Sequence, residues 1–305
     1  MQNNGMKSVY RFINIRDKMM KSVFFISALF SVIALITITV FLFSSGIPFI
    51  AKEGIKEFIF GSRWAPLSES PSYGIFPMIC ASLYVTLLSV IMGVSIGLMT
   101  SVCLYKFCPT KLVAPIRQTV NLLAGIPSVI FGMFGMTVIV PFIRDNISPN
   151  GVGYGILSSS IVLGIMILPT IVSVSLDSMN AVPESYFEGA LALGATKEQA
   201  TFKVLIPAAK SGIMAGVVLA IGRAVGETMA VIMVIGGSPE NPKSIFQSVR
   251  TLTANIAMGA TEMSGDAVSA LIATGIVLFL FTLFLNICFS LIKREKNVDK
   301  KRGRK

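Results

Sequence analysis

Arg223 and Glu227 are the residues whose position most clearly calls for a chemical role, since they are the only charges between Ser211 and Pro239. Their four-residue spacing places them on one face of a helix, where they can form an ion pair. Charged groups inside a membrane are costly and usually face the interior of a helix bundle or an aqueous path. In the functional interpretation, Arg223 binds two oxygens of a tetrahedral oxyanion, and Glu227 holds it in place and keeps the anion from binding too tightly to leave. The alternative is a self-neutralising pair that only locks helix packing.

A second departure from a lipid-facing helix is the sequence Gly125-Ile126-Pro127-Ser128. Pro127 has no N–H and clashes with the carbonyl of Leu123, so the helix should kink or break there. Polar backbone groups freed in this way are tolerated in a membrane where they find partners or line a cavity. We therefore predict a hinge at Gly125 and Pro127 that lines a transport path and offers the Ser128 hydroxyl to a polar solute. A kink that serves packing alone is the alternative.

Several kinds of chemistry are excluded by the residues that the chain lacks. It has no histidine, which removes the Ser-His triad and histidine-ligated metals. It has no G-x-x-x-x-G-K-[ST] sequence, so it does not bind ATP through a P-loop of its own. Gly93 and Gly97 flank Ser95 as in a nucleophile elbow, but without histidine they are better explained as small residues that let two helices approach closely. We expect no covalent chemistry, and no metal or cofactor bound by this chain.

The elements that carry these residues are membrane helices. Only 13% of the 305 residues are charged, against 53% that are apolar, and the mean hydropathy is +0.77. A soluble domain carries about a quarter charged residues. Long uncharged stretches, each able to hold the roughly 20 residues that cross a bilayer, predict an all-α bundle with six transmembrane helices. Their expected bounds are Val23–Phe43, Phe76–Leu104, Leu122–Ile143, Ile156–Leu176, Gly212–Gly237 and Val268–Ile292. The first is too long for a signal peptide and is expected to be retained.

The distribution of lysine and arginine predicts how the helices are oriented. Alternate connections hold 19 of these residues on one side and 6 on the other, with Arg223 inside a helix completing the 26. The positive-inside rule therefore puts both termini in the cytoplasm. The basic tail, residues 293–305, suits attraction to anionic membrane lipid. A nucleic-acid partner is not expected, because no aromatic residues interleave these basic ones.

The cytoplasmic connection from Asp177 to Ser211 has helical patterning without being a membrane span. Pro183 suits a first helical turn and Gly194 supplies a stop. Thr196 and Gln199 then match a capping box that opens a second short helix. The two helices either rest on lipid headgroups or form a knob on which a soluble partner can push.

This connection resembles the EAA loop of the permease subunits of ABC importers. The family pattern has E-A-A, three residues, Gly, nine residues and I-x-L-P, and the chain keeps every spacing. The residues that correspond are Glu188-Gly189-Ala190, Gly194 and Val204-Leu205-Ile206-Pro207. The departures replace small or apolar residues with other small or apolar residues. The resemblance implies a type I ABC importer transmembrane domain and assigns coupling to the ATPase to Glu188, Ala190, Gly194, Leu205 and Pro207.

Two further blocks, residues 126–135 and 222–230, look like those of the phosphate-specific branch of these permeases. This resemblance, which runs from about Tyr73 to Ile292, places Arg223, Glu227 and Thr228 on the pathway of inorganic phosphate. It implies a heterodimer with a PstA-like sister permease, a PstB-like ATPase dimer that uses ATP and Mg, and a PstS-like phosphate-binding protein. The implied location is the bacterial cytoplasmic membrane.

The chain is accordingly divided into four expected parts. These are a basic cytoplasmic N-terminus (1–22), a first helix with an external loop (23–72), the permease domain (73–292, with the coupling loop at 183–207) and the basic tail (293–305). An importer for sulfate or molybdate remains an alternative. So does a carrier driven by an ion gradient with Glu227 as its proton site, and, behind both, a membrane-embedded enzyme.

Overall fold

In the computed structural model, six helices of the described residues are long and apolar enough to cross a membrane, as the sequence predicts. The structure describes residues 2–302, and the surroundings of the side chains for residues 17–287. The six spans are Asp17–Glu53, Phe76–Phe107, Ser128–Asn146, Ile156–Asn180, Lys197–Gly226 and Asp266–Ile287.

The helices are joined by short segments and by one two-stranded antiparallel sheet, in which Trp64 pairs with Tyr73. The elements are α1 (Gln2–Glu53), α2 (Ile55–Phe60), β1 (Trp64–Ala65), β2 (Ser72–Tyr73), α3 (Phe76–Val102), α4 (Thr110–Gly125), α5 (Ser128–Phe134), α6 (Val140–Asn146), α7 (Ile156–Asn180), α8 (Glu184–Ala192), α9 (Lys197–Ala200), α10 (Ile206–Gly226), α11 (Met229–Ile235), α12 (Leu252–Gly259) and α13 (Asp266–Arg302). Three π-helical turns, η1 (Cys103–Phe107), η2 (Gly135–Ile139) and η3 (Thr201–Leu205), lengthen α3, α5 and α9.

Helix α7 is the central element of the bundle, and α3 packs along it through small residues. A Cβ added at Gly93 would lie 2.7 Å from the side chain of Ile167, and one at Gly97 would lie 2.8 Å from that of Ile171. Both isoleucines are fully buried. The interpretation of Gly93 and Gly97 as a close-packing stripe is therefore confirmed.

Of the four glycines in α10, only Gly212 and Gly216 pack closely in this way. Gly216 packs against Val174 of α7, where an added Cβ would be 3.0 Å from the valine side chain. Gly222 and Gly226, which continue the stripe in the sequence, have no atom within 4 Å of an added Cβ. Close packing at these two glycines is thus absent among the described residues, although Ala220 and Ala224 of the same helix still pack with Ile167 and Ile171 of α7.

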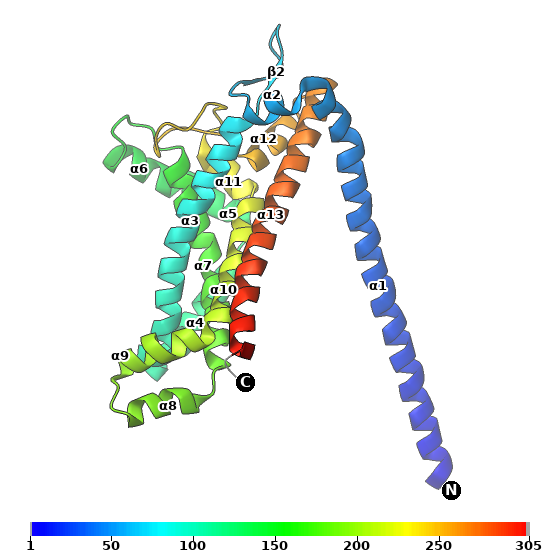
Figure 1. The fold of residues 1–305 in the computed structure, drawn as a ribbon, viewed down its shortest axis with the longest axis vertical. Coiled ribbons are helices and arrows are strands. Elements are labelled where there is room, and N and C mark those ends of the chain that lie inside the picture. The colour runs from blue at the N-terminus through cyan, green and yellow to red at the C-terminus, as the bar shows by residue number, and fades with distance from the viewer. Residues whose placement is uncertain (1, 303–305) are drawn as a thin grey trace.

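One end of the bundle is covered by an aromatic cap. Figure 1 shows α2, the β-strands and α12 at the end opposite α8 and α9. The rings of Phe49 and Tyr73 meet edge to face at 5.1 Å, and Phe58 is fully buried against them. Residues 238–266 lie at this end, and their helix α12 is not among the candidate spans. The cap fixes the top of α1 to the top of α3.

Helix α1 otherwise stands apart from the bundle (Figure 1). It packs on α13 near its C-terminal end, where an added Cβ at Gly46 would be 3.1 Å from the backbone of Ala273. No residue of its most apolar window is buried. Both the start of α1 and the end of α13 point to the end of the molecule that holds α8 and α9.

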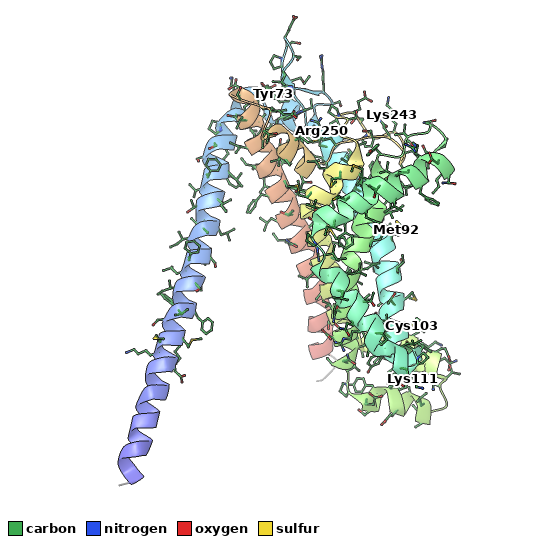
Figure 2. All side chains as sticks on the ribbon, turned by 180° about the vertical axis from the view of Figure 1, so that it is seen from behind. Tyr73, Met92, Cys103, Lys111, Lys243 and Arg250 are labelled. Atoms are coloured by element: carbon green, nitrogen blue, oxygen red, sulfur yellow. The ribbon has the colours of Figure 1, made fainter. Side chains whose placement is uncertain are left out.

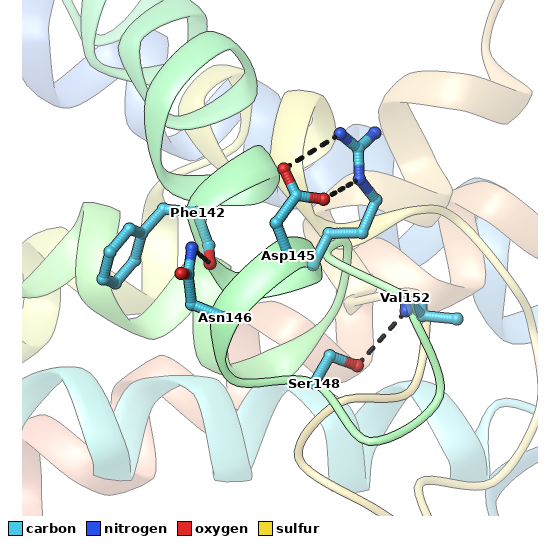
Figure 3. A network of polar contacts seen from close by, with 6 residues as sticks. Phe142, Asp145, Asn146, Ser148 and Val152 are labelled. Atoms are coloured by element: carbon cyan, nitrogen blue, oxygen red, sulfur yellow. Dashed lines mark hydrogen bonds and ion pairs between the residues drawn. The ribbon is translucent and has the colours of Figure 1, made fainter.

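The connection between α6 and α7 is held by local polar contacts (Figure 3). Arg144 Nε donates to Asp145 Oδ1 at 2.8 Å, and the Asn146 amide donates to the carbonyl of Phe142 at 3.0 Å. The hydroxyl of Ser148 accepts the N–H of Val152 at 3.2 Å. These contacts close the turn at the same end of the bundle as the aromatic cap.

Candidate substrate pathway and ATPase-coupling site

The third and fifth predicted spans are both interrupted, and the two interruptions have the same geometry. Helix α4 ends at Gly125 and α5 begins at Ser128; helix α10 ends at Gly226 and α11 begins at Met229. Ile126 (φ −72°, ψ 127°) and Glu227 (φ −71°, ψ 127°) are the extended residues that break each helix. Each donates its N–H to the carbonyl three residues earlier. The two helical segments are therefore interrupted by the same backbone conformation.

The interruption at Pro127 was expected, although its extent was not. The predicted span from Leu122 is in fact two helices, and α4 begins at Thr110, inside a segment that we expected to be a connection. Most residues of α4 are exposed, and several of them are polar, so the segment contains no long apolar run that would predict a membrane helix.

The prediction of a continuous fifth helix over Gly212–Gly237 is wrong at both ends. The helical segment already begins at Lys197 and stops at Gly226. No proline marks the stop. Instead, the Glu227 carboxylate accepts the N–H of Ala230, three residues later, at 3.0 Å, and this hydrogen bond caps the first turn of α11.

The expected ion pair between Arg223 and Glu227 is consequently absent from the ion pairs of residues 17–287. The helix ends before it reaches Glu227, so the geometry that would bring the two side chains together does not exist. Arg223 lies in the last turn of α10, is half-buried, and takes part in none of the side-chain hydrogen bonds of the described residues. Its guanidinium carries a positive charge that no carboxylate of this part of the chain neutralises.

The two interruptions are brought side by side because α5 packs on α11. An added Cβ at Gly132 would be 3.0 Å from Cα of Ala230, the residue whose N–H is capped by Glu227. Ser128 begins α5 one turn before Gly132, and the Thr228 hydroxyl donates to the carbonyl of Gly226 at 3.3 Å. The structure therefore places Ser128, Glu227 and Thr228 at one crossing of two broken helices, with Arg223 in the last turn of α10 before it, although no hydrogen bond of the described residues joins them across the crossing.

This crossing is open on one side. The predicted hinge residues Gly125 and Pro127 are exposed, and neither Gly125 nor Gly226 has any atom within 4 Å of an added Cβ. A path lined by these residues thus lacks a second wall among the described residues. No group of three or more acidic or cysteine side chains among residues 17–287 is placed to hold a metal ion.

The coupling loop forms the first expected short helix, α8, but the second is not separate: α9 is the start of the helical segment Lys197–Gly226, which runs on through Pro207. The N–H of Gly194 donates to the carbonyl of Leu191 at 2.9 Å, and that of Ala195 to the carbonyl of Ala190 at 3.1 Å. This is a Schellman motif, and it needs the positive φ of 86° at Gly194. Thr196 and Gln199 form the predicted capping box, with reciprocal bonds of 3.1 and 3.3 Å.

The predicted coupling residues fall into two groups. Glu188, Gly194 and Pro207 are exposed and Ala190 is half-buried, so a docking partner can reach them. Leu205 is 1% exposed and packs in the cluster that joins α3, α7 and α10. It can therefore only position the knob, and does not itself contact a partner.

Sequence reasoning missed the residues that fix α8 to α3. Lys106 Nζ lies 2.6 Å from Glu184 Oε1 and 4.1 Å from the ring centroid of Phe187. The ion pair joins residues 78 positions apart, and no local pattern in the sequence predicts either contact. Leu193, which is 91% exposed at the end of α8, was also missed. Its position directly before the glycine stop was the available signal.

A polytopic bundle with two interrupted helices and a two-helix knob at one end defines the class as a transmembrane transport subunit. Residues 93–297 match the model of the binding-protein-dependent transport system inner membrane component, and the chain belongs to this family of ABC importer permeases. It is a multi-pass membrane protein and a transport component rather than an enzyme.

Relatives of known name agree with this family. The chain is 38% identical over 274 residues to the probable ABC transporter permease protein YqgH of Bacillus subtilis, with 88% of each chain covered. It is 36% identical over 247 residues to the phosphate transport system permease protein PstC of Mesorhizobium japonicum, with 75% of each covered. It is 35% identical over 267 residues to PstC of Pasteurella multocida, with 81% of this chain and 82% of the relative covered.

Solved structures support the fold alone. A chain of a bacterial alginate ABC transporter superposes with a TM-score of 0.66 at 15% identity, covering 92% of this chain and 95% of that one. A chain of the MetNI methionine ABC transporter gives a TM-score of 0.58 at 21% identity, covering 72% and 95%.

Proposed function

We propose that this chain is the permease subunit of an ATP-driven, binding-protein-dependent importer that carries inorganic phosphate. The observation that supports it best is the guanidinium of Arg223, which no carboxylate of the described residues pairs and which lies beside the interruption of α10. The PstC relatives named above, at 35–36% identity, support phosphate as the anion.

The chemistry of the crossing suits a tetrahedral oxyanion. Arg223 offers several donors in a rigid fork, and a guanidinium is permanently charged. The hydroxyls of Ser128 and Thr228 offer weaker, neutral hydrogen bonds near the starts of α5 and α11. Glu227 acts differently from the sequence-based expectation. Its carboxylate caps the N-terminus of α11, and so stabilises the interruption between α10 and α11 rather than neutralising Arg223.

The open side of the crossing is the argument for a second membrane subunit. We propose that a PstA-like sister permease supplies the missing wall, which would cover Gly125, Pro127 and Gly226. A PstS-like protein would deliver phosphate to the end with the aromatic cap. A PstB-like ATPase dimer, which binds the ATP and Mg, would dock on α8 and α9. Membrane lipid would surround the rest.

The proposed orientation puts α8, α9 and both termini in the cytoplasm of a bacterial cell. The count of 19 lysine and arginine residues against 6 supports it. The direction of α1 and α13 in Figure 1, toward the α8–α9 end, is consistent with termini on one side.

Continuous helix from the knob to Arg223 offers a direct route for coupling. The span Lys197–Gly226 begins at α9 in the knob and ends one turn after Arg223. A displacement of α9 by the closing ATPase would therefore move the guanidinium without passing through a loop. We propose that this movement turns the path around Arg223 from outward to inward.

The test is uptake of labelled phosphate at low concentration by cells that lack this chain. Wild type should restore uptake, and Arg223→Ala should abolish it while the assembled complex remains intact. Arg63→Ala, which removes an exposed arginine of the outer loop, is the matched control and should leave uptake unchanged. Retained uptake with Arg223→Ala would show that Arg223 is only structural.

Two additional arms separate the rival functions. Sulfate and molybdate should not compete with labelled phosphate, and competition by either would move the assignment to another oxyanion. ATP depletion at constant membrane potential should stop uptake. Continued uptake under ATP depletion would favour a carrier driven by an ion gradient.

A further inference from the structure

Arg250 is a second half-buried arginine whose charge the described residues leave without an ion pair. It precedes α12, and Figure 2 shows it at the same end of the molecule as Tyr73 and Lys243, opposite Lys111 and Cys103. The residue is half-buried, so it keeps contact with the outer surface. Burial lowers its pKa, and Glu262 is the nearby carboxylate that favours its charged form without forming an ion pair.

Within the part of the chain whose side chains are described, the hydrogen bonds of Arg250 go only to neutral acceptors. Nε donates to the carbonyl of Gly237 at 2.8 Å, and Nη1 donates to Asn255 Oδ1 at 3.3 Å. An arginine has five N–H donors, so the remaining ones are available to another group. A partly desolvated cation surrounded by neutral acceptors favours the approach of an anion.

Asn255 adds a second unused donor at the same place. The residue is fully buried, and its Nδ2 has no hydrogen-bond partner among residues 17–287. Buried polar groups normally have a partner, so an unpaired one needs an explanation. The Oδ1 of the same amide contacts the guanidinium, which brings Nδ2 close to Arg250. The Arg250 guanidinium and the Asn255 amide donor therefore lie side by side, and neither donates a hydrogen bond to an anionic group of the described residues.

This cluster adjoins the interruption at Glu227. The Thr253 hydroxyl donates to the carbonyl of Glu227 at 3.1 Å, and the N–H of Leu252 donates to the hydroxyl of Ser82 on α3 at 3.0 Å. The first turn of α12 is therefore fixed between α3 and the start of α11. Arg250 stands only three residues before Thr253.

We propose that Arg250 and the Asn255 amide form an outer oxyanion subsite, which phosphate occupies before it reaches Arg223. The inference rests on the proposed function, because it presumes that an oxyanion travels along this path. A rival explanation is that Arg250 is only a latch that ties the end of α11 to α12 through its two hydrogen bonds.

The two explanations differ in what each substitution should do. Arg250→Lys keeps the charge but cannot reproduce the two-pronged contact to Gly237 and Asn255. Arg250→Gln keeps a hydrogen-bonding group but loses the charge. Asn255→Asp strengthens a latch, because it pairs Arg250 with a carboxylate, but it neutralises an anion site.

The experiment measures phosphate moved per ATP hydrolysed, in proteoliposomes that hold the complete transporter with saturating phosphate-loaded binding protein. Loss of a charge-assisted hydrogen bond to the anion predicts a fall of about tenfold or more for Arg250→Gln and for Asn255→Asp. Arg250→Lys should recover a substantial part of the wild-type ratio. Lys243→Gln, which removes an exposed cation of the same outer loop, should have no effect.

Either of two results would overturn the subsite. One is a wild-type ratio in Arg250→Gln or Asn255→Asp. The other is equal impairment of Arg250→Lys and Arg250→Gln with normal transport by Asn255→Asp, which is the pattern of a latch. Asn255→Asp also serves if Arg250→Gln does not assemble. Failure of the proposed function would look different, since the wild-type complex itself would then move no phosphate.

Discussion

Replacing Lys106 with methionine should uncouple ATP hydrolysis from transport. The lysine ties α8, the expected docking helix, to the end of α3 through Glu184 and Phe187. Methionine keeps an apolar side chain in the same place but removes the charge that makes both contacts. The ATPase should still dock on α8, but its movement would no longer reach α3.

The size of this link follows from the two contacts. The Lys106 side chain is 17% exposed and that of Glu184 is 58% exposed, so the ion pair is partly screened and contributes about 0.2–1 kcal/mol. The ammonium lies 4.1 Å from the ring centroid of Phe187, a cation–π contact of about 0.5–2 kcal/mol. Together they stabilise the attached state of α8 by about 1–3 kcal/mol, a factor of about 5 to 150 in its population.

The assay compares phosphate transported per ATP hydrolysed in proteoliposomes. We expect Lys106→Met to lower the ratio about fivefold or more, with the ATPase subunit still bound. Lys106→Arg keeps the charge and the contact with the ring, and should stay near wild type. Lys111→Met, which removes an exposed lysine outside the ion pairs of residues 17–287, is the control. A wild-type ratio in Lys106→Met would refute the reasoning.

Two further substitutions test the crossing and the knob. Gly132→Ala should destabilise the detergent-solubilised complex by about 1–3 kcal/mol, because the new methyl group would lie 3.0 Å from the backbone of Ala230. A thermal-unfolding comparison with Gly164→Ala, where the nearest atom is 3.6 Å away, checks this, and equal midpoints would contradict it. Gly194→Val should release the ATPase from the membrane or uncouple it, because a β-branched residue is strained at the φ of 86° that the Schellman motif needs. Gly194→Asn should be milder, since asparagine tolerates this conformation, and normal coupled uptake by the valine variant would argue against the docking role.

Features governed by short-range patterns could be predicted from the sequence. The six spans follow from charge-free length, the break at Pro127 from a missing N–H, and the helix ends at Gly194 and Thr196 from glycine stops and capping boxes. Each of these depends on residues within about one helical turn, where a pattern and its physical cause coincide.

The missed features depend on contacts between distant elements or on a side chain that turns back on its own backbone. The stop at Gly226 has no proline, and a helix pattern continues through Glu227, so an ion pair with Arg223 was the natural expectation. The carboxylate instead caps α11. The burial of Leu205 and the attachment of Lys106 to α8 both require the packing of α3, α7 and the knob, which the sequence does not reveal.

The most direct test is ATP-driven accumulation of labelled phosphate in proteoliposomes that contain only the purified transporter and its binding protein. The wild-type complex should accumulate phosphate with ATP and Mg and not with a non-hydrolysable analogue. The complex with Arg223→Ala should hydrolyse ATP without accumulation. Accumulation at the wild-type rate by the Arg223→Ala complex, or accumulation of sulfate in place of phosphate by the wild type, would contradict the proposed pathway.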